Sequence, residues 1–316
     1  MIRSLMPRLF MTSAVAMIFL QLWAPPALAK NHSLSITTNG KIHGCDEIQI
    51  KFDDGSRSLA VAREVRVLPS LRRSEVERLV IEAPQGSGLI VETTAGGSFE
   101  ATVCLAAGAR RKEDAAELLT GVTVGWTADR LSVDGPESDD DSWVVYLFVK
   151  APAGASLDLS AENGPIELRG LSGEIRARNQ NGPTSAEDCS GEIALTSRNG
   201  PVSVTGGSGR LTVEVENGPI SIALAGDRWQ GEGIDAHAQN GPVSLTVPGH
   251  YASGVLVESS GHSPFSCDGS PCAGARRSWD DDRRTLRIGG AKTQIRVSTV
   301  NGPMSVVAGG GWSDSI

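Results

Sequence analysis

Aromatic residues are scarce in this chain: six Trp, two Tyr and six Phe make up 4% of its 316 residues. Aromatic rings provide much of the stacking surface in ligand clefts, so their scarcity argues against a conventional sugar-stacking site. Histidine is also rare, and the five present fall in no paired metal-binding motif. The chain has no Gly-x-Ser-x-Gly nucleophile elbow either. The sequence therefore carries no signature of a metalloenzyme or a serine hydrolase, and we expect no cofactor and no metal.

Positive charge is in deficit as well. The chain has 29 Lys and Arg against 37 Asp and Glu, which gives a formal net charge of −8 at pH 7. No basic patch interleaved with aromatic residues is present. Nucleic-acid binding needs such a patch to neutralise phosphates, so nucleic acid is excluded as a partner.

Long apolar runs are limited to one, at residues 9–23. Arg3 and Arg8 precede it, and the small-residue triplet of residues 27–29 follows Pro25 and Pro26. This order is typical of a signal peptide over residues 1–29, with Lys30 as the first mature residue. An uncleaved anchor is the alternative, but the cleavage triplet directly after the run favours removal. No later segment has the 18 apolar residues that a spanning helix requires, so we expect no integral membrane segment after cleavage.

One tripeptide, Asn-Gly-Pro, dominates the rest of the chain. Six of the nine asparagines begin a copy. They are Asn163, Asn181, Asn199, Asn217, Asn240 and Asn301. The first four copies are 18 residues apart and the fifth follows after 23. A fixed short period is typical of stacked structural units.

Each repeat contains two short segments in which apolar and polar residues alternate, such as residues 166–169 and 174–178. This alternation indicates two half-buried strands. Eighteen residues are too few for a helical crossover between parallel strands. The sequence therefore predicts an all-β fold with a parallel β-solenoid of two strands per coil, preceded by a β-rich N-terminal region with one short helix.

The turn ladder is predicted at the six asparagines. Asn tolerates the left-handed backbone region and Gly adopts positive φ without strain, so both suit a tight turn. Pro lacks an N–H and fits the first position of a strand. Stacked in register, the asparagine amides can bond one another along the ladder. An amide-lined binding edge is the alternative, and a structural role that fixes the register is the interpretation we prefer.

The alternation also assigns the two faces of each strand. Inward positions carry aliphatic residues such as Val204 and Ile222, and a stripe of serines lies one residue before or after them. The stripe is Ser185, Ser203, Ser221, Ser244 and Ser305. It is either a hydroxyl-rich recognition face or an ordinary solvated one. Trp229 and Tyr251 flank the longer fifth unit and are a second candidate binding surface, favoured because function tends to lie where a repeat is interrupted.

Five cysteines allow two disulfides in an exported protein and leave one residue over. Cys267 and Cys272 flank a turn sequence and predict a local bridge, with a fragment of a metal site as the alternative. Cys45 and Cys104 lie in strand-like N-terminal segments and can pair. Cys189 occupies a core position of the repeat and is expected to be a buried thiol.

The remaining segments complete the organisation. Residues 30–150 form the predicted N-terminal region, with strands at 33–38, 47–52, 79–82, 88–93, 101–105, 122–126 and 143–149 and a helix at 110–120. Residues 151–307 form the repeat, interrupted at about 265–283, and 308–316 form a flexible tail. The acidic stretches 136–141 and 280–282 are interpreted as solvated hairpin tips, and cation binding by them stays open.

The entry into the repeat resembles that of bacterial putative-adhesin domain proteins. The resemblance is carried by residues 143–166, where a hydrophobic strand ends in a Pro-Ala-Gly turn and an Asn-Gly unit follows. Residues 112–119, 229–233 and 239–248 look similar too. The resemblance implies an exported β-solenoid and supplies no catalytic residues.

Together these features favour an exported, non-enzymatic, adhesin-like binding or scaffold protein of the bacterial cell envelope, in the periplasm or at the cell surface. Its ligand would be a protein or a glycan of the envelope or surface. A self-assembling envelope structural element is the first alternative, and a polysaccharide-processing β-helix enzyme is the second. Such an enzyme needs clustered carboxylates on one face, which the sequence alone does not display.

We predict that export removes residues 1–29. The small-residue triplet fits the signal peptidase, so the intact mass and N-terminal sequence of the protein from the exporting cell should begin at Lys30. An intact Met1 terminus held in the membrane fraction would contradict the assignment.

Overall fold

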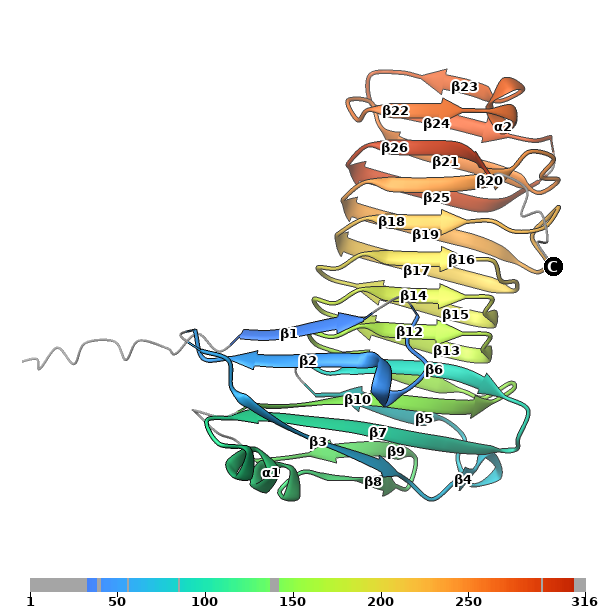
Figure 1. The fold of residues 1–316 in the computed structure, drawn as a ribbon. Helices are drawn as coiled ribbons and strands as arrows, with labels where there is room; N and C mark the ends of the chain where they lie inside the picture. The colour runs from blue at the N-terminus through green and yellow to red at the C-terminus, as the bar shows by residue number, and fades with distance from the viewer. Residues whose placement is uncertain are drawn as a thin grey trace, which may run out of the picture.

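The computed structural model describes residues 33–38, 41–55, 57–84, 86–136, 142–290 and 292–309. The signal peptide, most of the acidic stretch 136–141 and the tail beyond residue 309 lie outside the described residues. The described chain is all-β, as predicted, with two large sheets and a separate hairpin. Figure 1 shows the strands of both sheets stacked one above another along the long axis of the molecule.

The first sheet consists of β3 (Ala60–Val67), β4 (Leu71–Arg72), β6 (Gly88–Thr94), β7 (Ser98–Ala109), β10 (Ser142–Pro152), β12 (Ile166–Arg169), β14 (Thr184–Glu187), β16 (Val202–Thr205), β18 (Ile220–Ala223), β20 (Val243–Pro248), β22 (Phe265–Asp268) and β26 (Met304–Gly309). The second sheet consists of β5 (Leu79–Ala83), β8 (Thr123–Thr127), β9 (Arg130–Asp134), β11 (Leu157–Ala161), β13 (Ser172–Asn179), β15 (Ser190–Ser197), β17 (Arg210–Asn217), β19 (Gly233–Asn240), β21 (Gly254–Ser260), β23 (Arg276–Trp279), β24 (Arg283–Ile288) and β25 (Thr293–Asn301). The hairpin is β1 (Ser33–Thr38) with β2 (Ile48–Asp53), and the helices are α1 (Lys112–Thr120), α2 (Ser270–Ala273) and the 3-10 turns η1 (Cys45–Glu47) and η2 (Arg73–Glu75).

In the repeat region the chain crosses from one sheet to the other with each successive strand from β11 to β20. Each strand pairs in parallel with the strand one repeat later in the same sheet, so Ser185 lies beside Ser203 and Ile175 beside Ile193. The sequence repeat and the pairing register are therefore the same. The sheets are mixed, however. β3, β7 and β10 pair antiparallel at one end, and β21, β24 and β23 pair antiparallel at the other.

The order of strands departs from the order of the chain at the sixth Asn-Gly-Pro copy. β25 and β26 pair directly with β19 and β20, although some fifty residues separate them in sequence. β21 and β22 in turn lie outside β25 and β26. After β20 the chain thus skips the neighbouring layer and forms the end of the stack with β21 to β24. It then returns as β25 and β26, which occupy the skipped layer. The interruption predicted at about 265–283 corresponds to part of this end structure.

The core between the two sheets consists of the residues assigned inward by their alternation. Val204 and Ile222 are 4% and 2% exposed, and the equivalent residues of the other repeats are buried as well. Ser203, between two core residues, is exposed. Aliphatic side chains of similar size stack in layers, as in other repeat folds.

The six asparagines form a continuous ladder. Each later one donates its Nδ2 to the Oδ1 of the one beneath, over distances of 2.8 to 3.1 Å. The bond from Asn301 reaches Asn240 across the out-of-order layer. The ladder is therefore continuous at this layer, although the two strands that meet there are not consecutive in the chain.

The glycines of the repeat serve a different purpose from the one expected. None of the six Asn-Gly-Pro glycines adopts positive φ. A Cβ on Gly200 would instead lie 2.1 Å from the carbonyl oxygen of Gly182, and one on Gly241 would lie 2.0 Å from that of Gly218. Glycine is required because consecutive turns stack backbone on backbone. Positive φ occurs at Gly191 and Gly209, in the Ser-Gly turn on the opposite edge.

The N-terminal hairpin adds a third layer. Ile48, Ile50 and Phe52 of β2 pack on Cys104 and Tyr146 of the first sheet, and this cluster is separate from the main core. The predicted disulfide between Cys45 and Cys104 is present and ties the hairpin to β7. This layer covers part of the outer face of the first sheet, and Figure 1 shows it in front of that sheet. The short predicted helix is present as α1, with Ala115 and Leu119 buried.

We predict that Gly200→Ala destabilises the protein by about 1–3 kcal/mol, the usual cost of forcing an extra methyl into a packed site. The free energy of unfolding, from urea denaturation, measures it. Gly125→Ala in β8 is the matched control, because a Cβ there meets nothing within 4 Å. Equal stability of the two variants would show that the turns do not stack as closely as described.

Candidate functional site

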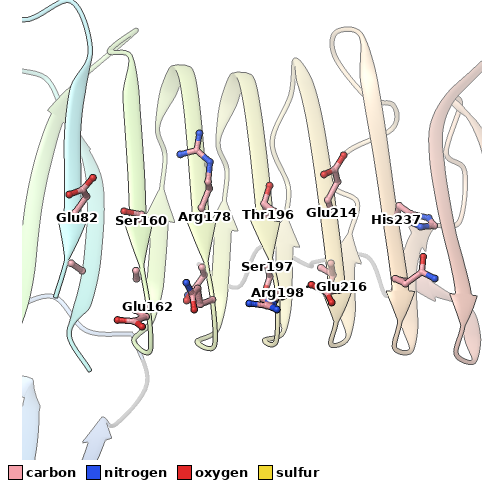
Figure 2. A pocket seen from close by; sticks show the side chains of 16 residues that line it. Glu82, Ser160, Glu162, Arg178, Thr196, Ser197, Arg198, Glu214, Glu216 and His237 are labelled. Carbon is pink, nitrogen blue, oxygen red and sulfur yellow. Dashed lines mark ion pairs between the residues drawn. The ribbon is translucent and has the colours of Figure 1, made fainter. Parts of the chain in front are cut away.

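A groove runs across the outer face of the second sheet, along the edge where the asparagine turns lie. It has a volume of about 820 Å³ and crosses β5, β11, β13, β15, β17 and β19. Figure 2 shows two parallel rows of side chains along it. The upper row is Glu82, Ser160, Arg178, Thr196, Glu214 and His237, and the row nearer the turns is Glu162, Gln180, Arg198, Glu216 and Gln239. We call this surface the two-row groove.

The repeat itself places both rows. From Ser160 onward, the upper row lies three residues before each asparagine and the lower row one residue before it. The residue between them points inward by strand alternation and is buried, as Asn179 and Ser197 are. Six strands at about 4.8 Å spacing give the groove a length of roughly 24 Å.

The buried residues beneath the groove hold the turn. Asn179 donates Nδ2 to the carbonyl of Gly164 at 2.9 Å and accepts the Gly182 N–H at 3.1 Å. Ser197 donates to the Gly200 carbonyl at 3.0 Å. Their hydrogen bonds satisfy backbone groups inside the turn, so the edge of the groove is rigidly built.

The groove carries mixed charge, with four carboxylates and two guanidinium groups. Arg178 is held by Asp158 at 2.6 Å, and Arg198 lies 3.5 Å from Glu216. Within the described residues, Glu162 and Glu214 form no ion pair. The groove therefore presents carboxylate acceptors that are unpaired among the described residues, Glu162 and Glu214, beside guanidinium donors that ion pairs hold in place.

His237 closes one end of the upper row. Its Nδ1 lies 3.0 Å from the Ser298 hydroxyl, which is also within 3.3 Å of the Ala236 carbonyl. With the Ser298 hydroxyl donating to that carbonyl, Nδ1 donates to Ser298 and Nε2 is left as an acceptor. Glu214 is the cross-strand neighbour of His237 on the other side.

This arrangement suits binding along a line. Hydrogen-bonding groups recur at every strand on a firm backbone, and no aromatic ring lines the groove. No group of three or more His, Cys, Asp or Glu side chains in the described part of the chain is arranged to hold a metal ion.

The predicted serine stripe is in register on the outer face of the first sheet. Ser203 lies beside Ser185 and Ser221, and Ser244 lies between Ser221 and Ser305. The structure thus brings these residues together. Their role in binding stays a prediction.

Trp229 and Tyr251 are placed differently from what a binding role requires. They are 4% and 7% exposed. The Trp229 indole donates to the Gly209 carbonyl at 2.8 Å, and burial raises the pKa of Tyr251 to about 12, so its hydroxyl stays protonated. Large rings fill the wider interior of the longer fifth unit. Neither ring offers a face to solvent in this conformation, and their predicted contact with a ligand is untested.

The remaining cysteines agree with expectation. Cys267 and Cys272 form the predicted local disulfide, and Cys189 is free and buried. Burial raises the pKa of the Cys189 thiol.

The two-row groove itself was not singled out from the sequence. Its signal was present: the residues three and one before each asparagine vary, yet nearly all are polar or charged. The residue type at these positions differs from repeat to repeat, so they form no visible pattern in the sequence, unlike the identical serines of the stripe.

Comparison with known proteins adds little. No protein-family model and no curated protein match the chain. Among solved structures, it is similar to a putative cell adhesion protein from Clostridium sporogenes, with 9% identity over 78% of this chain and 99% of the other and a TM-score of 0.29. A putative adhesin from Bacteroides fragilis shares 10% identity over 78% and 97%, with a TM-score of 0.24. A putative lipid binding protein from Parabacteroides distasonis shares 10% over 78% and 97%, with a TM-score of 0.29. These TM-scores are too low for the likenesses to support a conclusion about fold or role.

Of the helices that the structure describes, none has the length and apolarity needed to cross a membrane.

We predict that Cys189 resists thiol reagents in the folded protein. Burial raises its pKa, so the nucleophilic thiolate is scarce at pH 8, and the side chain is only 5% exposed. Labelling with iodoacetamide, followed by mass spectrometry, should be slow in buffer and rapid in denaturant. Rapid labelling without denaturant would show that this core position opens readily.

Proposed function

We propose that the chain is an exported, non-enzymatic binding or scaffold protein of the bacterial cell envelope that holds an extended ligand in the two-row groove. The repeat region, residues 151–307, acts as a β-solenoid scaffold, and residues 30–150 form its N-terminal part after loss of the signal peptide. The ligand is a segment of a glycan or a protein chain. The observation that carries the proposal is the groove, because one repeated turn creates the same pair of polar positions on successive strands.

The shape of the groove supports a linear ligand. A small molecule would be enclosed by a deep pocket, whereas this surface is long and open and crosses six strands of a sheet. Ligand groups repeating along a chain could meet equivalent positions on successive strands.

The side-chain chemistry supports recognition by hydrogen bonds. Arg178 and Arg198 donate, the glutamates accept, and Gln180 and Gln239 do both. The free carboxylates of Glu162 and Glu214 suit hydroxyl or amine groups of the ligand. Both disulfides fit an exported protein.

Carboxylates in one groove are also what a glycoside hydrolase would need. Glu214 and Glu216 are the pair on one strand that such an enzyme would use. Both lie on an open sheet face, with no wall that would exclude water from a reacting bond, and we therefore favour binding over hydrolysis.

We predict that Thr196→Trp, in the middle of the upper row, reduces ligand binding about tenfold or more. An indole there would fill the groove, and the side chain points outward, so the sheet keeps its core. Retention of the purified protein on isolated peptidoglycan sacculi and on an array of bacterial envelope polysaccharides and surface proteins measures the effect.

The matched control is Ser203→Trp, an outward strand position on the opposite sheet. It should bind like the unmodified protein. Loss of binding in Ser203→Trp alone would show that the serine stripe, and not the two-row groove, is the binding site. Release of oligosaccharides from any array member would refute the non-enzymatic assignment.

A further inference from the structure

Among the residues that the structure describes, the C-terminal end of the stack has a β-strand edge without a partner. β23 is the last strand of the second sheet and pairs only with β24. Figure 1 shows it at the end of the molecule. All four of its residues, Arg276–Trp279, are exposed, and the Trp279 side chain is 51% exposed. An exposed edge is a template for a further strand.

The backbone groups that face outward on this edge can be identified. The Asp280 N–H donates to the Arg283 carbonyl at 3.0 Å, so Asp280 directs its backbone toward β24. By strand alternation, Ser278 and Arg276 do the same. The N–H and C=O groups of Arg277 and Trp279 therefore point away from the sheet and are available to a new strand.

The alternation also fixes the side chains. Arg277 lies beside buried Leu286, and Trp279 lies beside Arg284, so both are on the inner side of the sheet. Arg276, Ser278 and Asp280 are on the outer side. Opposite residues of an antiparallel pair share a face, so only a register that preserves this division is allowed.

We propose that β23 pairs antiparallel with β23 of a second copy of this chain, about a two-fold axis at Ser278. In this register Arg277 faces Trp279 of the other copy, Arg276 faces Asp280, and Ser278 faces Ser278. Each of the first two pairs occurs twice, because the interface is the same from both sides.

Charge complementarity supports a second copy rather than another strand. Arg276 and Asp280 make two ion pairs across the axis, and neither forms an ion pair within the described residues. The Asp280 Oδ1 already accepts the N–H groups of Asp282 and Arg283, and this holds the carboxylate in place with Oδ2 remaining.

The tryptophan completes the match. The Arg284 guanidinium carbon already lies 5.3 Å from the centre of the Trp279 ring, and Phe265 lies 6.0 Å away. Arg277 of the second copy would approach the same ring from the free edge, where a cation–π contact is favourable. The serines at the centre leave room for the strands to meet.

The pairing uses hydrogen bonds of the Arg277 and Trp279 backbones, two for each facing pair. It joins like ends, so it closes at a dimer and cannot extend into a filament. It also leaves the two-row groove open on both copies and does not depend on what binds there.

Sedimentation velocity of the purified protein over a range of concentrations tests the proposal. The unmodified protein should form a dimer and no larger species. Arg277→Pro should abolish the dimer, because proline removes an outward N–H while leaving the bonds from β23 to β24 intact. Arg276→Asp should weaken the dimer at least about tenfold, because two ion pairs become two repulsions.

Arg110→Asp, an exposed charge reversal distant from this end of the chain, is the matched control and should dimerise normally. Thermal melts should show both β23 variants folded, which separates loss of pairing from loss of structure. A monomeric unmodified protein, or a dimer that persists in Arg277→Pro and Arg276→Asp, would overturn the proposal.

Discussion

The close stacking of one turn on the next is the constraint on which the rest of this structure depends. From the second Asn-Gly-Pro turn onward, the glycine backbone lies against the carbonyl of the glycine beneath, too close to leave room for a Cβ atom. The asparagine amides then reach from one turn to the next at hydrogen-bonding distance. Because every turn sits directly above its predecessor, the strands between the turns have no freedom to slip, and a one-residue slip would expose the whole core face. The tripeptide thus fixes register, and register fixes which side chains are buried.

The geometry of the two-row groove follows from the same constraint. Positions counted back from the asparagine alternate between solvent and core, so each repeat contributes two outward side chains and one buried residue. At Asn179 and Ser197 this buried residue is polar and its side chain bonds the backbone of the turn. The scaffold is uniform while the outward positions vary from Ser160 to His237. A surface of this kind can change its ligand without changing its fold, since substitutions in the rows touch neither the ladder nor the core.

The sequence predicted what is local and periodic. Spacing or composition over a few residues was enough to predict the inward residues, the asparagine ladder, the Cys267–Cys272 bridge and the helix at α1. The Cys45–Cys104 pair, 59 residues apart, was predicted from the strand-like segments around the two cysteines. Strand β3 was missed, since its sequence alternates poorly, and so was β9. The return of β25 to pair with β19 has no local signal either: the register of Asn301 on Asn240 is visible only in space. The burial of the two aromatic residues could not be predicted from the sequence. In a chain poor in rings they suggest a contact surface, whereas in the structure they fill the interior of the longer fifth unit.

The Asn-Gly-Pro motif predicted the turns correctly, but its glycine is required for close stacking and not for positive φ. If the glycine were needed for positive φ, other residues that tolerate the left-handed region could replace it. Because the turns stack so closely, no residue larger than glycine fits at this position, whatever its backbone angles. The asparagine ladder ends at Asn301, although β21 and β22 add one more layer to the stack beyond it. At the outer end of the second sheet, β23 and the following Asp280 carry charges and a ring in an order that suits the antiparallel pairing proposed above. The repeated turns hold the stack together but do not cover its last strand, and at this end the exposed edge is residues 276–280, whose charges complement those of the same segment running in the opposite direction.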